Sequence, residues 1–329
     1  MPKIVRFYEK GGPEVLKLED APAEQPGANE VRLRVQAVGL NRAEALYMRG
    51  FYFEQPKLPS RIGYEAAGVV EAVGPGVDKS WVGKQVATVP GYSMNQYGAL
   101  GEQAVVPASA LGEYPPGLSP EEGAAIWMQY MTAWGALVHY GHVAAGDAVV
   151  IPAASSSVGL AAIQIVKDAG AIAIAATRTS KKRKDLLDLG ASHVIATEEE
   201  DLPARVSEIT GGNGARLIFD PVAGPYVEKL AEAAAAGGIL FEYGGLSMQP
   251  TPFPMLAAMR RGLSMRGYSL MEFRNNPSVL DEARNYICER LADGRFRPKI
   301  AKAFPLTQAV EAYRYLESNA QVGKVVITV

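Results

Sequence analysis

The chain has 329 residues, of which 48% are hydrophobic and 21% charged, and its formal net charge at pH 7 is −2. This length exceeds one typical core and predicts two domains, while the near-neutral charge gives no reason to expect a nucleic-acid or anionic-membrane partner. The single cysteine, Cys288, excludes an internal disulfide, and no apolar run reaches about 18 residues, so we expect a cytoplasmic protein without a membrane span.

The first 122 residues are dense in turns and short strands. Apolar and polar residues alternate, or nearly so, and the strands expected from them cover residues 4–7, 15–18, 31–38, 62–74, 84–89 and 103–107. A short helix is expected within residues 39–50, with Gly50 as its end. This part of the chain is therefore predicted to be a β-rich, partly barrel-like domain.

The composition changes near residue 118. Ser119 followed by Glu122 has the spacing of a capping box, which predicts a helix that leads through Trp127 to Tyr140.

Residues 147–178 form the stretch around which the fold is organised. An apolar run at 148–151 predicts a buried strand, a helix follows from Val158 until Gly170, and residues 171–176 predict a second strand. The turn of such a βαβ unit is where a dinucleotide pyrophosphate binds. The glycine fingerprint is partial, because Ala154 and Ser156 stand at its first two positions and only Gly159 remains. The alternative is an ordinary serine-rich turn.

The end of the second strand indicates which nucleotide binds. NAD-binding chains usually have an acidic residue there, whereas this chain has Thr177 and Arg178, followed by Ser180 and the cations at 181–184. An arginine suits the 2′-phosphate of NADPH, so NADPH is expected rather than NADH. Lys182 is included in this site, while Lys181 and Lys184 are equally consistent with a solvated helix start.

Strands and helices then alternate, as in a doubly wound sheet. Strands are expected at residues 193–195, 217–220, 238–242 and 263–268, and helices at 202–209 and 225–236. Helices at 279–293 and 309–316 and a strand at 323–329 are expected to return to the first domain. We therefore predict an α/β protein with a Rossmann domain at 123–266 and a β-rich domain at 1–122 and 267–329.

Several motifs together resemble the medium-chain dehydrogenase/reductase superfamily, and within it the zinc-independent, zeta-crystallin-like NADPH:quinone oxidoreductase group. They are the residues at 38–41, 63–70 and 73–74, the Ala-Ser-Ser-Ser-Val-Gly turn, and the residues at 219–224 and 323–326. The resemblance covers essentially the whole chain. It implies that the β-rich part is a GroES-like catalytic domain and that the protein is a homodimer, paired through the nucleotide domain near residues 238–268.

The resemblance also implies that no zinc is bound. Zinc-dependent members have Cys, His and Cys at the positions of Asn41, Tyr64 and Met128, and these three side chains do not form a zinc site. The three histidines, His139, His142 and His193, are scattered and are expected on the surface or in loops.

Without zinc, the reaction implied is hydride transfer to an acceptor that is already electrophilic, such as a quinone or an α,β-unsaturated carbonyl compound. Asn41 is expected to hold the cofactor ribose or a substrate oxygen, or simply to cap its helix. Tyr52 matches the proton donor of mitochondrial enoyl thioester reductases, or covers the cleft mouth. Tyr64 would donate to the substrate oxygen, or is a packed strand residue.

The resemblance assigns further residues to the cofactor. Those expected near the nicotinamide, the phosphates and the carboxamide are Gln129, Thr132, Ser155, Ser156, Ser157, Val158, Gly244, Leu246, Ser247, Tyr268, Ser269 and Leu270. Two alternatives remain open at this point. One is an enoyl thioester reductase, and the other is a noncatalytic NADPH-binding sensor or crystallin-like protein.

Overall fold

The computed structural model describes residues 1–273 and 276–329, which form two compact units. Unit 1 comprises Met1–Met128 and Arg297–Val329, and unit 2 comprises Gln129–Phe296. Within the described residues, no helix has the length and apolar character that a membrane span requires.

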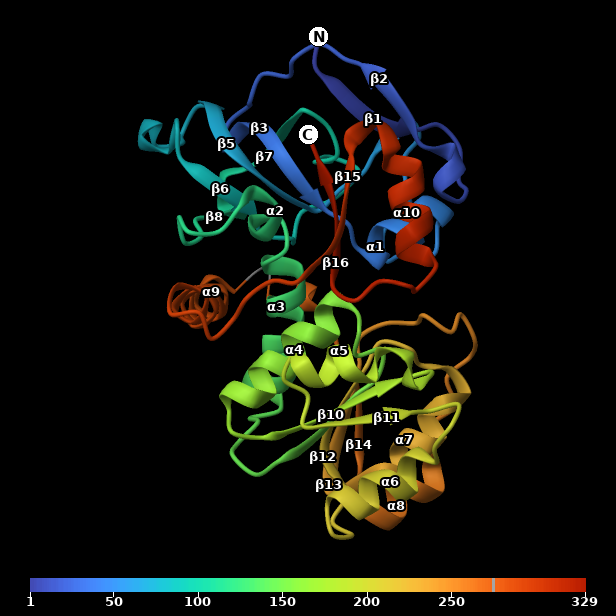
Figure 1. The fold of residues 1–329 in the computed structure, drawn as a ribbon. Helices are drawn as coiled ribbons and strands as arrows, with labels where there is room; N and C mark the ends of the chain where they lie inside the picture. The colour runs from blue at the N-terminus through green and yellow to red at the C-terminus, as the bar shows by residue number, and fades with distance from the viewer. Residues whose placement is uncertain (274–275) are drawn as a thin grey trace. The chain divides into compact units, whose positions relative to one another are not determined.

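Unit 1 is built from two β-sheets (Figure 1). The smaller, antiparallel sheet has the order β2-β1-β4, with bounds β1 Lys3–Phe7, β2 Lys17–Asp20 and β4 Ser60–Arg61. The larger sheet runs β15-β16-β3-β5-β6-β8, and β7 pairs with β3. Its strands are β3 Glu30–Gly39, β5 Glu65–Val73, β6 Gln85–Thr88, β7 Gln103–Pro107, β8 Leu111–Gly112, β15 Ile300–Pro305 and β16 Lys324–Thr328. The β-rich, GroES-like character expected from the sequence is confirmed.

The central strand β3 shows why this sheet forms. Val31, Leu33 and Val35 are buried on one side, while Arg34 between them is exposed, which is the period-2 pattern of a sheet with one covered face. Helices α1 (Arg42–Arg49) and α10 (Ala309–Glu317) belong to the same unit, and an ion pair of 2.5 Å between Arg49 and Glu317 joins them.

The helix expected from Ser119 to Tyr140 is confirmed only in part. The capping box at Ser119 is confirmed, because Ser119 N–H donates to Glu122 Oε2 (2.9 Å) and Glu122 N–H donates to Ser119 Oγ (3.2 Å). However, the helix it starts, α2 (Pro120–Gly123), is a single turn. The chain resumes as α3 (Trp127–Trp134) and a π-helical segment at Gly135–Tyr140, so the single helix expected through Tyr140 is interrupted.

Unit 2 contains a parallel sheet with the order β11-β10-β9-β12-β13-β14. This is the Rossmann order, which reverses between β9 and β12, and in open sheets of this kind ligands bind beside the carboxyl ends of the strands at such a reversal. The strands are β9 Ala148–Ile151, β10 Ile172–Thr177, β11 His193–Ala196, β12 Ala215–Asp220, β13 Ala234–Glu242 and β14 Ser264–Gly267. The helices are α4 Ser157–Asp168, α5 Arg183–Asp188, α6 Leu202–Ile209, α7 Val227–Ala233, α8 Met255–Arg261 and α9 Pro277–Ala292.

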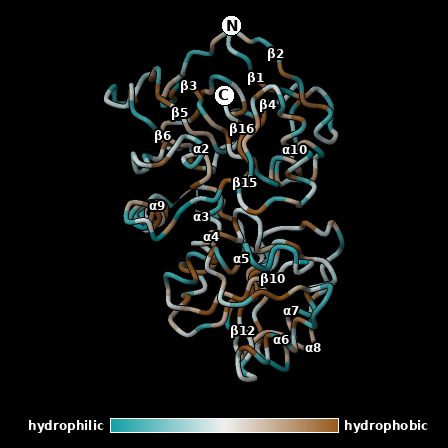
Figure 2. The backbone as a smooth tube through the Cα atoms, viewed as in Figure 1, coloured by the Kyte–Doolittle hydropathy of each residue, from teal (hydrophilic) through white to brown (hydrophobic). Residues whose placement is uncertain are grey.

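The core of unit 2 lies where α6 and α7 pack on the sheet. Val206 of α6 and Leu230 of α7 are fully buried in one cluster with Val150, Ile174 and Ile218 of the central strands. Figure 2 shows hydrophobic residues concentrated in these strands. The predicted doubly wound sheet is therefore confirmed.

The chain returns to unit 1 at Arg297, whereas the sequence placed this return at residue 267. Helix α9 stays with unit 2 because Arg290 forms an ion pair of 2.5 Å with Asp168 at the end of α4. Just after α9, the Phe296 ring stacks on Tyr130 at 5.1 Å between centroids. Both contacts join segments far apart in the sequence, so periodicity alone does not reveal them.

Candidate functional site

The turn after β9 has the close packing that a nucleotide-binding turn needs. Ser156 is the N-cap of α4, and its Oγ accepts the backbone N–H of Gly159 at 3.0 Å. A Cβ on Gly159 would lie 2.6 Å from the carbonyl oxygen of Ala154, so glycine is required where helix and strand meet. Ser157 and Val158 form the first turn of α4. Gly159, the third glycine of the fingerprint, therefore still allows the close packing of helix and strand, although the first two glycines are absent.

The cations after β10 fall into two groups. Arg183 forms an ion pair with Glu200 at 2.5 Å, and Lys184 pairs with Asp188, so these two serve the fold. Lys182 Nζ instead donates to Ser155 Oγ at 3.0 Å, which ties the cation loop to the turn after β9. Burial lowers the pKa of Lys182, and the nearby Arg178 cation lowers it further.

Arg178 is exposed, and its guanidinium forms no ion pair with any residue that the structure describes. Arg178 and Lys182 therefore bring two positive charges close together beside the nucleotide-binding turn. This arrangement favours an anion.

A carboxylate from the next strand reaches this loop, which the sequence did not indicate. Glu199, in the turn after β11, accepts hydrogen bonds from Ser180 N–H (2.9 Å) and Ser180 Oγ (3.2 Å). The predicted cofactor residue Ser180 thus already has an acidic partner. Only the pairing of β10 with β11 brings these residues together, so no local sequence signal could have found the contact.

The loop after β13 folds onto the loop after β12. Leu246 N–H donates to the Pro221 carbonyl oxygen (3.0 Å) and Ser247 N–H to that of Val222 (2.9 Å). A Cβ on Gly244 would lie 2.6 Å from the Pro221 carbonyl oxygen, which explains glycine there. These expected carboxamide-lining residues therefore lie at the carboxyl edge of the sheet.

The residues expected after β14 are packed differently. The Tyr268 ring is buried among aromatic side chains, and its hydroxyl lies 3.3 Å from the Met131 carbonyl oxygen. Leu270 is buried as well, and Ser269 Oγ accepts the Met271 N–H at 3.2 Å. Burial of an aromatic ring is favourable, so the Tyr268 side chain packs in the core of unit 2 and not at the open carboxyl edge of the sheet.

The early α3 residues Gln129 and Thr132 are both buried. Gln129 Oε1 has no hydrogen-bond partner among the described residues, although a buried amide oxygen normally has one. An external donor such as a nicotinamide carboxamide would satisfy it. This orphaned atom fits the expected cofactor.

A pair of acids at the same sheet edge is a second feature that the sequence did not indicate. Asp220 and Glu242 end β12 and β13 and stand opposite each other in the parallel register. Asp220 accepts the N–H groups of Val222 (2.8 Å) and Ala223 (2.9 Å), whereas both Glu242 carboxylate oxygens lack a donor among the described residues. Burial, reinforced by Asp220, raises the pKa of Glu242 to about 8.

In unit 1, Asn41 is the N-cap of α1, as the alternative interpretation foresaw. Its Oδ1 accepts from Lys324 Nζ at 2.7 Å, and its Nδ2 donates to the Gly39 carbonyl oxygen (3.0 Å) and to Glu44 Oε1 (3.3 Å). The amide is thus largely occupied within the protein. The same side chain is part of the capping box of α1 with Glu44.

Asn41, Tyr64 and Met128 stand where the resemblance implies zinc ligands in zinc-dependent members. They are linked by one network, which we call the buried Glu–Lys–Glu network (Glu44, Glu65 and Lys324). Lys324 Nζ pairs with Glu65 Oε2 at 2.6 Å, and both side chains are fully buried. Met128 N–H donates to Glu65 (3.1 Å), and Tyr64 N–H donates to Glu44 (3.0 Å). An ammonium group therefore lies next to Asn41.

Tyr52 and Tyr64 also lie together, with ring centroids 6.3 Å apart. Burial raises the pKa of Tyr52 to about 12 and raises that of Tyr64 further, so Tyr52 is the stronger acid of the two. Tyr64 is almost fully buried and Tyr52 is half-buried. Tyr52 is therefore the better placed of the pair to exchange a proton with a ligand.

Two further observations bear on other sites. Within residues 1–273 and 276–329, no three His, Cys, Asp or Glu side chains are grouped as metal ligands.

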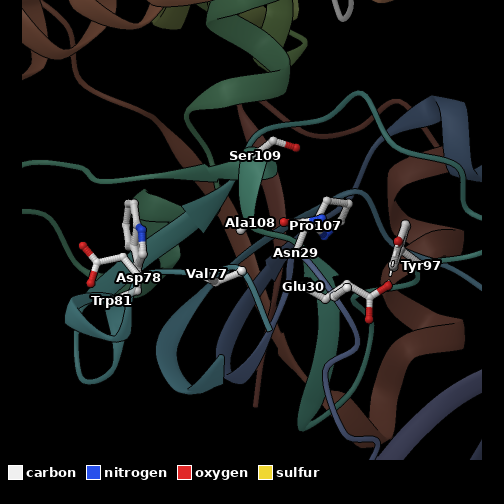
Figure 3. Close-up of a pocket in the computed structure, with 11 residues that line it drawn as sticks. Asn29, Glu30, Val77, Asp78, Trp81, Tyr97, Pro107, Ala108 and Ser109 are labelled. Carbon is white, nitrogen blue, oxygen red and sulfur yellow. Dashed lines mark hydrogen bonds between the residues drawn. The ribbon is translucent and has the colours of Figure 1, made fainter. Parts of the chain in front are cut away.

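A surface pocket of about 500 Å³ in unit 1 contains none of the predicted site residues (Figure 3). Trp81 and Asp78 lie at one side of it and Tyr97 and Glu30 at the other, where the Tyr97 hydroxyl donates to Glu30 at 2.8 Å.

Comparisons with known proteins agree with the division of the chain into two units. Residues 27–140 match the family model of the alcohol dehydrogenase GroES-like domain, and residues 157–285 match the model of the zinc-binding dehydrogenase. A 2-haloacrylate reductase from Burkholderia sp is 30% identical, over 98% of this chain and 97% of its own.

Two solved structures are similar over nearly the full chain. The Escherichia coli quinone oxidoreductase complexed with NADPH is 29% identical with a TM-score of 0.92, covering 99% of this chain and 100% of its own. An NAD-dependent alcohol dehydrogenase is 31% identical with a TM-score of 0.87, covering 99% of both chains.

Proposed function

This chain belongs to the medium-chain dehydrogenase/reductase superfamily and to its quinone oxidoreductase group, and from this premise we propose that it is an NADPH-dependent reductase of quinones or α,β-unsaturated carbonyl compounds. Membership makes it an NAD(P)-dependent oxidoreductase. The observation that carries the choice of NADPH is the pair of cations, Arg178 and Lys182, beside the nucleotide-binding turn.

The choice of NADPH follows from charge. A 2′-phosphate carries roughly −1.5 to −2 charges near pH 7, and Arg178 has no acidic partner among the described residues that would compete for it. The other cofactor residues we propose are Thr177, Ser180, Gln129, Thr132, Gly244, Leu246, Ser247, the serines at 155–157 and Val158. NADPH, when bound, supplies the hydride, and the N–H groups of the turn after β9 hold its pyrophosphate.

The proton that follows the hydride is assigned to Tyr52. Its pKa of about 12 keeps the phenol protonated at neutral pH, so it can donate to a developing oxyanion. Tyr64, whose pKa is raised further, is proposed to orient Tyr52 within the aromatic pair. Asn41 is proposed to hold the cofactor ribose or a substrate oxygen.

The proposed chemistry uses no zinc. Amide, phenol and thioether side chains at positions 41, 64 and 128 lack the donor chemistry of a zinc site. An acceptor that is electrophilic without metal is therefore required, which supports quinones and activated alkenes over simple alcohols. The haloacrylate reductase among the relatives supports the activated alkene, and the quinone oxidoreductase supports the quinone.

An enoyl thioester reductase is the second candidate, because the position of Tyr52 favours it. A Tyr52→Phe variant that loses most of its turnover with an enoyl thioester, but keeps quinone turnover, would support that reaction. A protein that binds NADPH and reduces no acceptor would instead be a noncatalytic sensor or crystallin-like protein.

We also propose that the protein is a homodimer through β14, which is the last strand of the unit 2 sheet. Near this edge, α8 and the segment before it carry exposed apolar side chains. They are Phe253, Met255, Leu256 and Met259, with exposures of 63%, 56%, 68% and 75%. Apolar side chains in such number on one short segment favour a partner surface. Sedimentation of Leu256→Asp against the unaltered protein tests this.

The cofactor proposal is tested by Arg178→Ala. Loss of a charge-assisted hydrogen bond should weaken NADPH binding by about 10- to 100-fold, while NADH binding stays nearly unchanged. Lys181→Ala, which removes an exposed cation from the same loop, is the matched control and should have the smaller effect. Equal losses for NADPH and NADH in the Arg178 variant would refute the phosphate role.

A further inference from the structure

The contact between Glu199 and Ser180 lies inside the proposed phosphate site. Glu199 Oε1 accepts both the backbone N–H and the hydroxyl of Ser180, at 2.9 and 3.2 Å. These are the kinds of donor that would otherwise bind a 2′-phosphate oxygen. The carboxylate therefore stands where the phosphate is expected to bind.

The backbone around Glu199 is fixed, although its side chain is exposed. Thr197 N–H donates to the Thr177 carbonyl oxygen at 2.8 Å, and Glu198 N–H donates to that of Arg178 at 2.9 Å. Glu199 N–H in turn donates to the Ala196 carbonyl oxygen at 2.9 Å. These bonds hold the turn after β11 against the loop after β10, so the Glu199 backbone stays beside the loop and its side chain can return to Ser180.

The acids nearby have different partners. Glu200 is engaged by Arg183 and Arg205, whereas Glu199 forms no ion pair with a described residue. Its negative charge is therefore not neutralised, and it would oppose a second anion at Ser180. Arg178 and Lys182 would attract that same anion.

We infer that Glu199 is a specificity-determining residue that competes with the 2′-phosphate for Ser180 and so limits the preference for NADPH over NADH. This inference rests on the proposed NADPH site. The cations of the loop favour the phosphate, Glu199 disfavours it, and the balance sets the ratio of the two affinities. A charge on an exposed side chain can be displaced at small cost, so NADPH still binds.

The test compares two fragments that differ only in the 2′-phosphate, adenosine 2′,5′-bisphosphate and adenosine 5′-monophosphate. Their dissociation constants are measured by calorimetry on the full chain, which requires no turnover. Glu199→Gln keeps an oxygen that accepts from Ser180 but removes the charge. Glu198→Gln is the matched control, because Glu198 is an exposed neighbour whose side chain forms no hydrogen bond or ion pair with a described residue.

We expect Glu199→Gln to tighten binding of the bisphosphate by about tenfold and to leave the monophosphate within about twofold. The gain should shrink as salt is raised, since exposed charges are screened. Glu198→Gln should change neither constant by more than about twofold.

Three results would overturn the inference. One is an unchanged bisphosphate affinity in Glu199→Gln, and another is an equal gain in Glu198→Gln, which would reflect overall charge alone. The third is weaker monophosphate binding in Glu199→Gln, which would make Glu199 an acceptor for the ribose hydroxyl. Arg178→Ala in the same titration separates the two proposals. If it weakens the bisphosphate selectively while Glu199→Gln does nothing, only this inference fails.

Discussion

The two units bury their acidic groups in opposite ways. In unit 1, Glu65 pairs with Lys324 at 2.6 Å, and Glu44 accepts hydrogen bonds from Tyr313, Tyr64 and Asn41. In unit 2, Glu242 faces Asp220, and no cation among the described residues forms an ion pair with either. Every acid of the buried Glu–Lys–Glu network has a partner, whereas the carboxyl pair of unit 2 must hold a proton.

This difference has consequences for stability. A buried ion pair is costly to break, because removal of one partner leaves the other charge buried with neither a partner nor solvent to stabilise it. A carboxyl pair without a cation is instead costly to ionise, and its cost depends on pH. The network should therefore respond strongly to mutation, and the carboxyl pair should respond to pH.

The largest effect is expected from Lys324→Met, which leaves the Glu65 charge buried and unpaired. It should lower the free energy of unfolding by about 3–5 kcal/mol, measured by urea denaturation. Adding Glu65→Gln to it should restore a large part of the loss, since both charges are then gone. A loss below about 1 kcal/mol in the single variant would show that the network does not carry the stability assigned to it.

Tyr313→Phe removes one hydrogen bond to Glu44, of 2.7 Å between buried atoms. Hydrogen bonds to charged groups contribute roughly 1.5–3 kcal/mol, so we expect a loss in that range in the same urea experiment. Burial already raises the pKa of Glu44, and the lost donor should raise it further. Stability equal to that of the unaltered protein would mean that Glu44 is neutral and does not need the phenol.

The pH prediction concerns Glu242, whose pKa is raised from 4.5 to about 8. The folded protein binds this proton more tightly than the unfolded chain, so the contribution of Glu242 to stability should be full below about pH 4.5 and should be lost as the pH rises to about 8. Glu242→Gln should flatten this slope and stabilise the protein at pH 8 by roughly 1–3 kcal/mol. Glu232→Gln, at an exposed position of α7, is the control. If stability depended on pH in the same way in both variants, the claim that Glu242 holds a proton in the folded protein would be contradicted.

The smallest effect is expected where charge is exposed. Lys84 and Glu113 form a pair of 2.7 Å, with side-chain exposures of 41% and 58%. Lys84→Met should change stability by less than about 1 kcal/mol in urea denaturation. A loss of stability as large as that of Lys324→Met would show that burial does not explain the difference between the two ion pairs.

Local signals in the sequence predicted much of the fold. The Ser119–Glu122 capping box and the βαβ unit at 147–178 depend on residues within a few positions, and both are found in the structure. The alternative interpretation of Asn41 as a helix cap was equally local, and the structure bears it out.

What the sequence did not reveal is long-range. Lys324 meets Asn41 and Glu65 across more than 250 residues, and Glu242 meets Asp220 only through strand pairing. Glu199 is one of three consecutive glutamates after β11, and its contact with Ser180 depends on how β11 lies beside β10. Spacing along the chain carries no information about such pairs, so the residues that tune charge at the site required the structure.

The measurement that tests the account most directly is NADPH oxidation, with a chelator present, against an ortho-quinone and a 2-alkenone side by side. The account predicts turnover with at least one of them, undiminished by the chelator. Turnover of the alkenone should fall in Tyr52→Phe. NADPH binding without turnover of either acceptor would contradict the account, and so would activity that the chelator abolishes.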